Sequence, residues 1–393
     1  MSQKLQYAAG AVLLLASSTV RLAAYPIVTS DYTYFLSKWF DALAANPGLS
    51  AFKMPFADYA PLYLYALKLL TFIPISSLYS IKTLSLVFDI ALASVAVMLV
   101  RQAMPSAGGL SGQGGTRFFA FAVMMSVPTF VINDSLWGQS DIIYASGVAA
   151  SLYFVLTDRP LPAVLFFALA LSVKAQAVFF FPVLLGYAIR KRAWWQLSLI
   201  PAIYLLAVVP AWLGGGSFPY WFFIYLHQAG EYNGLSVSAQ SIFAFANPLP
   251  LSAVMISVLF YAGILAALAC AAALTVAVVR TPQAFSSQIV LLALLCASVL
   301  PYLLPRMHER YFFLADVFSV LYALYVPRRW YLPAIVVFAS LISYMPFLSG
   351  QVSWFSAINI DLRIPSVLML VAIVMTIVSE RLQLSAVGSN AYT

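Results

Sequence analysis

A polar turn, NDSLWGQSDI, separates two long apolar runs of the sequence. It brings together two carboxylates, an indole and an amide: Asp134, Asp141, Trp137 and Gln139. Aromatic faces stack on sugar rings, while acids and amides bond to hydroxyl groups. The combination therefore predicts a sugar-binding surface. The alternative interpretation is an interfacial tryptophan beside aspartates that cap the loop.

A second cluster, RMHER, lies at the mouth of two otherwise apolar runs and holds Arg306, His308, Glu309 and Arg310. Ionisable residues raise the free energy of membrane insertion at such a position, which favours a function for them. Two guanidinium groups and an imidazole are suited to binding a phosphate. Lys174 also lies at a turn between apolar runs, where a lysine must snorkel or form a pair.

Two more acids precede short helical patterns. Asp58 comes just before PLYLYAL and is either a substrate-binding residue or a solvated loop residue. Asp31 begins DYTYFLSKWFDAL and is either the N-cap of a helix or a catalytic base at the membrane edge. The apolar residues that follow it have helical spacing and predict an interfacial helix with one apolar face: Tyr32, Phe35, Leu36, Trp39, Phe40 and Leu43.

The scaffold that positions these residues must be embedded in lipid. Of the 393 residues, 63% are hydrophobic and 8% are charged, whereas a soluble domain has about 25% charged residues. Long runs of Leu, Ala and Val predict helices, because the backbone must satisfy its own hydrogen bonds in lipid. We therefore predict an all-α, single-domain bundle of about 12 spans, at residues 4–24, 79–101, 117–133, 140–157, 161–175, 176–190, 194–214, 251–280, 286–305, 310–327, 330–348 and 363–382.

The positive charges predict the orientation of this bundle. If the N-terminus is cytoplasmic and the apolar run 59–76 does not cross, the loops rich in Lys and Arg lie inside, as the positive-inside rule requires. We therefore interpret 59–76, which is bracketed by Pro61 and Pro74, as a re-entrant or interfacial segment. The outer loops 26–78 and 215–250 then form a reaction chamber. Most of the acids lie outside or at the outer membrane edge: Asp31, Asp41, Asp58, Asp134, Asp141, Glu231, Glu309 and Asp361.

Other features narrow the chemistry. The net charge of +8 follows from the positive-inside bias, so we expect no nucleic-acid partner. Cys270 and Cys296 lie within apolar runs, which predicts no disulfide. We expect no cofactor and favour a metal-independent mechanism, although carboxylates alone could hold Mg²⁺ or Mn²⁺. Asp89 lies inside a predicted span, and we expect it to pair with Lys82 on the same helix face.

Four short motifs occur in order along the chain: SDY at 30–32, DYAPL at 58–62, WGQSD at 137–141 and HERYFF at 308–313. Together they resemble the GT-C superfamily of integral membrane glycosyltransferases, which use polyprenyl-phosphate-linked sugars as donors. SDY and DYAPL look like the dolichyl-phosphate-glucose-dependent glucosyltransferases. WGQSD and HERYFF look like bacterial relatives of the second mannosyltransferase of GPI-anchor synthesis.

The resemblance implies an inverting hexosyltransferase of glycolipid biosynthesis, with mannose favoured over glucose. Its expected partners are a polyprenyl-phosphate sugar, a lipid-linked or glycan acceptor and membrane lipid. It implies Asp31 as the general base and leaves open whether Asp134 or Asp141 orients the substrate hydroxyls. The donor phosphate would be held by His308 and Arg310, assisted by Arg306 or Lys174. The compact loops favour a bacterial inner membrane with a periplasmic site.

Three other functions are compatible with a polytopic protein. A transporter or flippase for a glycolipid is the main alternative, although transporters place charges near the bilayer midplane and are built from repeats. A non-catalytic scaffold does not explain why acids and cations share one predicted face. A transferase that moves a pentose or an aminosugar to lipid stays within the enzyme class.

Overall fold

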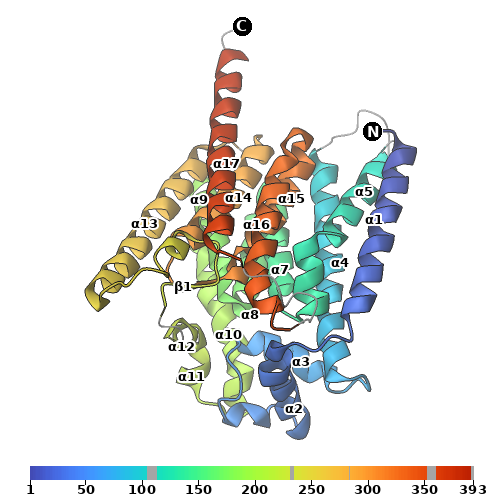
Figure 1. Ribbon diagram of the computed structural model, residues 1–393, viewed down its shortest axis with the longest axis vertical. Helices are drawn as coiled ribbons and strands as arrows, with labels where there is room; N and C mark the ends of the chain where they lie inside the picture. The colour runs from blue at the N-terminus through green and yellow to red at the C-terminus, as the bar shows by residue number, and fades with distance from the viewer. Residues whose placement is uncertain (104–112, 231–233, 283, 352–359, 391–393) are drawn as a thin grey trace. The chain divides into compact units, whose positions relative to one another are not determined.

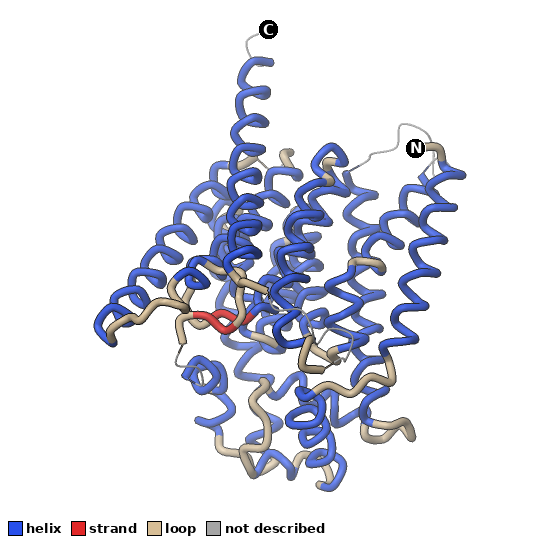
Figure 2. The backbone as a smooth tube through the Cα atoms, in the orientation of Figure 1, coloured by secondary structure: helices blue, strands red, loops and turns tan. Residues whose placement is uncertain are grey.

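The computed structural model describes residues 1–103, 113–230, 234–282, 284–351 and 360–390. Helices make up most of the described chain and strands very little of it, as Figures 1 and 2 show, so the prediction of an all-α fold is confirmed. The chain divides into two compact units. The first comprises Met1–Val178 and Ala193–Glu231, and the second comprises Phe179–Arg192 and Tyr232–Thr393.

The first unit is a helical layer with short helices gathered at one end (Figure 1). Helices α1 and α5, α4 and α7, and α7 and α8 pack as neighbours. The elements of this unit are α1 (Gln3–Ala24), a π-helical turn (Tyr32–Leu36), α2 (Ser37–Ala45), α3 (Pro61–Leu70), α4 (Ser77–Ala103), α5 (Gly114–Met125), α6 (Pro128–Val131), a second π-helical turn (Ile132–Leu136), α7 (Asp141–Leu156), α8 (Pro160–Val173), α10 (Leu199–Leu213), α11 (Phe218–Phe222) and α12 (Ile224–Gly230), with short 3₁₀ turns at Ser50–Lys53 and Trp194–Ser198.

The second unit is a helix bundle that holds one short piece of sheet. Strands β1 (Ser236–Val237) and β2 (Met307–His308) pair in parallel, and they are drawn in red in Figure 2. Each helix packs against the next one along the chain from α13 to α17, and α9 packs against α13. The helices are α9 (Phe181–Arg190), α13 (Ala253–Arg280), α14 (Ser286–Leu303), α15 (Phe313–Tyr325), α16 (Tyr331–Leu348) and α17 (Arg363–Asn390), with 3₁₀ turns at Ile242–Phe245, Glu309–Phe312 and Pro327–Arg329. A further 3₁₀ turn, Ala175–Phe180, contains the boundary between the two units.

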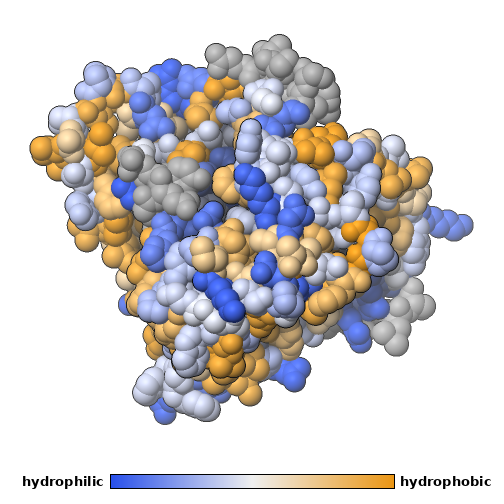
Figure 3. Space-filling model, turned by 90° about the horizontal axis from the view of Figure 1, so that it is seen from below, coloured by the Kyte–Doolittle hydropathy of each residue, from blue (hydrophilic) through white to orange (hydrophobic). Residues whose placement is uncertain are grey.

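The helices identify a multi-pass membrane protein. Among the described residues, six are long and apolar enough to cross a bilayer: Gln3–Ala24, Ser77–Ala103, Trp194–Leu213, Ala253–Arg280, Ser286–Leu303 and Pro327–Leu348. A seventh candidate is the pair Gly114–Met125 and Pro128–Leu136, which is bent by 48°. Large apolar side chains on these helices are exposed, and Figure 3 shows apolar surface beside hydrophilic patches on one face. The remaining predicted spans coincide with shorter helices or, for 363–382, with α17, and the count of twelve stays a prediction.

The segment predicted to be re-entrant contains helix α3, which begins with Pro61 at its first turn. Its ten residues are about 15 Å long, which is about half of the hydrocarbon thickness of a bilayer. Tyr63 and Leu64 are buried, and α3 packs against α2, α8 and α10. Lys68 donates two hydrogen bonds of 2.7 Å to carbonyls at the end of α2, where backbone acceptors lack helical partners. The place of α3 relative to the membrane stays a prediction.

The predicted apolar face after Asp31 is largely confirmed. Leu36, Trp39, Phe40 and Leu43 are buried, in agreement with the helical spacing. The other two predicted positions differ, because Tyr32 is half-buried and Phe35 is exposed.

A buried ion cluster ties three helical segments of the first unit together. The Arg21 guanidinium of α1 donates to the Asp134 carboxylate and lies 2.8 Å from the Asp89 carboxylate of α4. The predicted Asp89–Lys82 pair is wrong, because Arg21 takes Asp89 as its partner. The Lys82 ammonium instead donates to three carbonyls that follow α1: Ala24 at 3.1 Å, Tyr25 at 2.9 Å and Ile27 at 2.8 Å. Both cations therefore fix the end of α1 against its neighbours.

Charged residues lie at both ends of the helices of the first unit. Helix α1 begins beside the start of α5, where Tyr7 adjoins Gly114, and the end of α4 bonds to the end of α7 through Gln102 and Leu156. Lys4, Arg101 and Arg117 belong to these helix ends. Asp141 begins α7 at its other end, Asp31 follows α1, and Lys174 follows α8. The orientation in the membrane stays a prediction.

Replacing Arg21 by Ala is expected to destabilise the first unit, because two carboxylates would stay buried without their counter-charge. Removing one partner of a buried ion pair costs about 3–5 kcal/mol. Chemical unfolding of the detergent-solubilised protein should show a clearly lower midpoint for Arg21→Ala. The exposed Arg101 at the end of α4 supplies the control Arg101→Ala, and equal midpoints for the two variants would contradict a structural role for the cluster.

Candidate functional site

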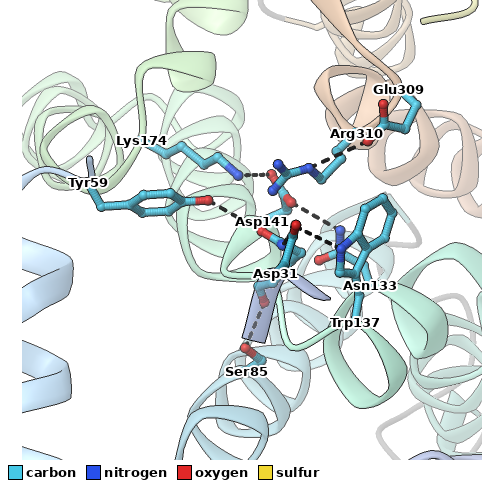
Figure 4. A network of polar contacts seen from close by, with 10 residues as sticks. Asp31, Tyr59, Ser85, Asn133, Trp137, Asp141, Lys174, Glu309 and Arg310 are labelled. Atoms are coloured by element: carbon cyan, nitrogen blue, oxygen red, sulfur yellow. Dashed lines mark hydrogen bonds and ion pairs between the residues drawn. The ribbon is translucent and has the colours of Figure 1, made fainter. Parts of the chain in front are cut away.

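The Asp31 carboxylate is held by two neutral donors from the polar turn. The Trp137 indole N–H donates to Asp31 Oδ2 at 2.9 Å, and the Gln139 amide donates to the same oxygen at 2.7 Å. Asp31 has helical backbone angles and makes no side-chain cap bond, so the N-cap interpretation is wrong. Its side chain is half-buried, and Figure 4 shows the Trp137 indole pointing toward it.

The backbone between the two donors explains how both reach one oxygen. Gly138 has φ +77°, a left-handed conformation that favours glycine, and it separates Trp137 from Gln139. Two hydroxyl groups hold the turn in place: Thr29 Oγ1 donates to the Trp137 carbonyl at 3.2 Å, and Ser85 Oγ donates to the Gln139 carbonyl at 2.9 Å. One bond comes from the segment after α1 and the other from α4, so the turn is held from two sides and the orientation of the donors is fixed.

The burial of Trp137 argues against the predicted stacking of a sugar on its ring. The side chain is 1% exposed, so its ring offers no open face on which a sugar could stack. Its N–H is satisfied by Asp31, as a buried indole requires. In this conformation Trp137 positions the carboxylate of Asp31.

Asp141 belongs to a second, adjoining set of contacts. Its carboxylate accepts from Lys174 Nζ at 2.6 Å and from Asn133 Nδ2 at 3.0 Å, and it is fully buried. Lys174 Nζ also lies 5.3 Å from the centre of the Tyr59 ring. The Tyr59 hydroxyl donates to the side-chain oxygen of Gln139 at 3.3 Å, so the two sets of contacts form one network (Figure 4).

The two remaining acids that were predicted to bind substrate have other surroundings. Asp134 is buried and paired with Arg21 in the ion cluster, so of the two candidates in the turn only Asp141 joins the network around Gln139. Asp58 is half-buried in the loop before α3, and its backbone carbonyl accepts from the Gln228 side chain. Burial raises the pKa of the Asp58 carboxyl above its ordinary value.

In the second unit, the sheet and a tight turn gather the predicted phosphate-binding residues. Val237 pairs with His308, and the Arg306 N–H donates to the Leu235 carbonyl at 2.8 Å. Arg306 has φ +61°, which is strained for a side chain of this size, and its guanidinium lies 4.8 Å from the centre of the Phe260 ring. The pairing of β1 with β2 therefore holds the RMHER segment in one fixed conformation.

Glu309 lies between His308 and Arg310. Its carboxylate is 3.8 Å from His308 Nδ1 and 3.7 Å from Arg310 Nε. Glu309 is buried, and His308 is largely buried beside the Tyr311 ring at 5.2 Å between ring centres. The two arginines exceed the single carboxylate, so the cluster carries a net positive charge suited to an anion.

The sequence patterns did not identify several residues that now prove central. Asn133, Tyr59 and Ser85 all take part in the network, and Arg21 balances the charge of Asp134. Tyr59 and Asn133 adjoin acids that were singled out, which is the one signal that could have indicated them. Within the described part of the chain, no three His, Cys, Asp or Glu side chains form a group that could hold a metal ion. Metal independence stays a prediction.

The Lys174–Asp141 pair gives a measurable coupling. Lys174→Met should destabilise the protein by about 3–5 kcal/mol, because the buried Asp141 carboxylate loses its counter-charge. In the double variant Lys174→Met/Asp141→Asn both charges are absent, so much of the loss should be recovered. Chemical unfolding of all four forms should give a coupling free energy of about 0.5–3 kcal/mol, whereas additive losses would contradict the pair.

Asp58 predicts a pH dependence of stability. Its pKa is raised in the folded state, so the folded protein holds its proton more tightly than the unfolded chain does. The contribution of Asp58 to stability is therefore largest at low pH and is lost as pH rises from about 4, the ordinary value, through the raised folded value. The unfolding midpoint of the wild type should fall relative to Asp58→Asn across this window. A constant difference between the two proteins would contradict the shift.

The chain matches no protein-family model, and no curated protein matches its sequence significantly. Any function must therefore be argued from the membrane helices, the Asp31 network of the first unit and the RMHER cluster of the second.

Proposed function

We propose that this chain is an inverting glycosyltransferase that moves a hexose from a polyprenyl-phosphate sugar to a lipid-linked or glycan acceptor. One observation carries the proposal: the Asp31 carboxylate lies at the end of a membrane helix layer, half-buried and oriented by Trp137 and Gln139. A carboxylate held in this way is suited to accept a proton from a sugar or lipid hydroxyl.

Asp31 acts as the general base in a single in-line displacement. The acceptor oxygen forms a bond to the anomeric carbon while the bond from that carbon to the phosphate oxygen breaks. The acceptor proton passes to Asp31, and the electron pair of the broken bond leaves with the polyprenyl phosphate. Base and leaving group act on opposite faces of the sugar ring, which inverts the configuration. Such bases contribute about 10²–10⁴-fold to the rate.

The donor phosphate is assigned to the cationic cluster of the second unit. Arg306, His308 and Arg310 are fixed by the β1–β2 pairing, and preorganised cations stabilise the charge that develops on a leaving phosphate. The Lys174 ammonium is committed to Asp141 in the first unit. We therefore assign Lys174 and Asp141 to the hydroxyl groups of the substrates and keep the three residues of the second unit for the phosphate.

The broader features of the proposal come from the sequence and from its resemblance to the GT-C superfamily. The chain is proposed to be a GT-C-like enzyme with about 12 spans, with the catalytic end outside the cytoplasm. A bacterial inner membrane with a periplasmic site is the proposed location, and mannose is favoured over glucose as the sugar. No metal is required, because the cluster itself supplies positive charge for the phosphate.

One observation favours the alternative of a transporter. Arg21, Asp89 and Asp134 form a buried ion cluster within membrane helices, a position at which transporters bind ions. Here the three residues pair with one another and connect α1 to α4, which favours a structural role. Proteoliposomes distinguish the two functions: counterflow of a glycolipid without bond formation would favour a transporter.

Asp31→Asn should reduce sugar transfer by about 10²–10⁴-fold while expression and the unfolding midpoint stay unchanged. Trp137→Phe keeps the ring but removes one donor to the carboxylate, so it should reduce kcat about tenfold. Both effects are measured with radiolabelled polyprenyl-phosphate mannose and glucose plus a membrane lipid extract.

The matched control is Asp41→Asn, because Asp41 is an exposed aspartate on the neighbouring helix α2. This variant should transfer sugar at the wild-type rate. Full activity in Asp31→Asn, or an equal loss in Asp41→Asn, would remove Asp31 from the mechanism.

A further inference from the structure

An apolar cavity of about 400 Å³ lies within the first unit, between α3, α4, α7 and α8. Its lining is almost wholly hydrocarbon and includes Phe88 of α4, Ala150 of α7 and Phe166 of α8. Two side chains of the lining carry hydroxyl groups, Tyr63 and Ser146, and the Ser146 hydroxyl already donates to the Ile143 carbonyl at 2.8 Å. The cavity therefore offers a ligand mostly apolar contacts.

The cavity reaches the surface that faces lipid. Phe166 is 38% exposed and Leu169 is 45% exposed, and both belong to its lining. From Ile143 to Ala150 the lining follows α7 for seven residue steps, or about 10 Å. An empty space of this size forfeits dispersion contacts along its whole wall. In a bilayer it can be filled by a hydrocarbon chain that enters between the helices.

One end of the cavity adjoins the polar network. Val173 lines the cavity and is followed directly by Lys174, and Ile143 stands two residues after Asp141. The ring of Tyr63, also in the lining, lies 5.3 Å from the ring of Tyr59. The Tyr59 hydroxyl bonds to Gln139, which in turn bonds to Asp31. A chain in the cavity therefore has its polar head at the network that contains the proposed base.

We propose that this cavity binds the hydrocarbon chain of the acceptor, which is accordingly a membrane lipid with a hydroxyl-bearing head group. The inference rests on the proposed function, and it selects the lipid among the acceptors left open there. The base must contact the acceptor, and Asp31 belongs to the same unit as the cavity. The residues assigned to the donor phosphate belong to the second unit. We therefore assign the cavity to the hydrocarbon chain of the acceptor.

The polar groups at the cavity end also match a hydroxyl. A hydroxyl group can donate to a carboxylate and accept from an ammonium, and Asp141 and Lys174 present both kinds of partner. A quaternary ammonium head group can donate no hydrogen bond. Diacylglycerol and phosphatidylcholine therefore form a suitable pair of probes, because they share hydrocarbon chains and differ in the head group.

The test uses the full chain in phosphatidylcholine vesicles with a diacylglycerol that carries a photoactivatable group in its chain. Crosslinks should map to the lining between Ile143 and Ala150, and unlabelled diacylglycerol should displace them. Ala150→Phe places a ring in the cavity and should reduce these crosslinks about tenfold, as the loss of two or more buried methylenes implies. Ala91→Phe also fills the cavity, from an exposed position on α4, and should reduce the crosslinks by a similar factor. This second variant tests the proposal even if Ala150→Phe does not fold.

The control is Ala262→Phe, because Ala262 lines another apolar hollow, on α13 in the second unit. It should leave the crosslinks between Ile143 and Ala150 unchanged. Crosslinks that unlabelled diacylglycerol does not displace would show nonspecific contact with membrane lipid and would overturn the proposal. A loss of crosslinks in Ala262→Phe equal to the loss in Ala150→Phe would also overturn it.

Sugar transfer separates this inference from the proposed function. In the transfer assay, Ala150→Phe should raise the KM for the lipid acceptor and leave the KM for the polyprenyl-phosphate donor unchanged. A raised donor KM alone would overturn the assignment to the acceptor while the enzyme proposal stands. Displaceable crosslinks without sugar transfer under any condition would overturn the proposed function itself.

Discussion

The need to neutralise carboxylates inside a helix layer organises the first unit. Asp89 and Asp134 are both buried, and Arg21 meets both of them with one guanidinium. The two ion pairs of Arg21 join α1 to α4 and to the π-helical turn before Trp137. Since an isolated charge in a low-dielectric interior is very costly, the three segments cannot separate without exposing the cluster. The turn that carries Trp137 and Gln139 is thereby anchored at one end by an ion pair and at the other by the hydroxyl groups of Thr29 and Ser85.

The anchored turn determines what Asp31 can do. A carboxylate paired with arginine or lysine has its charge satisfied, as Asp134 and Asp141 show in two different places. The indole N–H and the amide that hold Asp31 are neutral, so they orient the carboxylate without carrying a full opposite charge. Asp31, Asp134 and Asp141 therefore lie in different surroundings although all three belong to the first unit.

The sequence predicted the lipid-embedded helices, the polar turn and the apolar face after Asp31, because composition and periodicity depend on near neighbours. It could not predict partners that lie far apart in the chain. Asp89 was expected to pair with Lys82 on its own helix, but the unsatisfied carbonyls after α1 compete for that lysine and Arg21 comes from another helix. Trp137 was expected to present an open ring, and its burial follows from a bond to Asp31, a residue more than a hundred positions away. The two-residue strands at 236–237 and 307–308 are too short to leave a periodic pattern.

The apolar cavity extends this reasoning from side chains to substrate. Polar groups at its end are held by one another, so a ligand head group must offer both a donor and an acceptor to enter the network without leaving a buried group unsatisfied. The walls of the cavity favour an apolar part of the ligand, since any polar atom placed beside Phe88 or Phe166 would lose its hydrogen bonds. A molecule with one hydroxyl-bearing end and one long apolar end meets both conditions. The same constraint that forces Arg21 to join Asp89 and Asp134 thus also restricts which acceptor can bring a hydroxyl to Asp31.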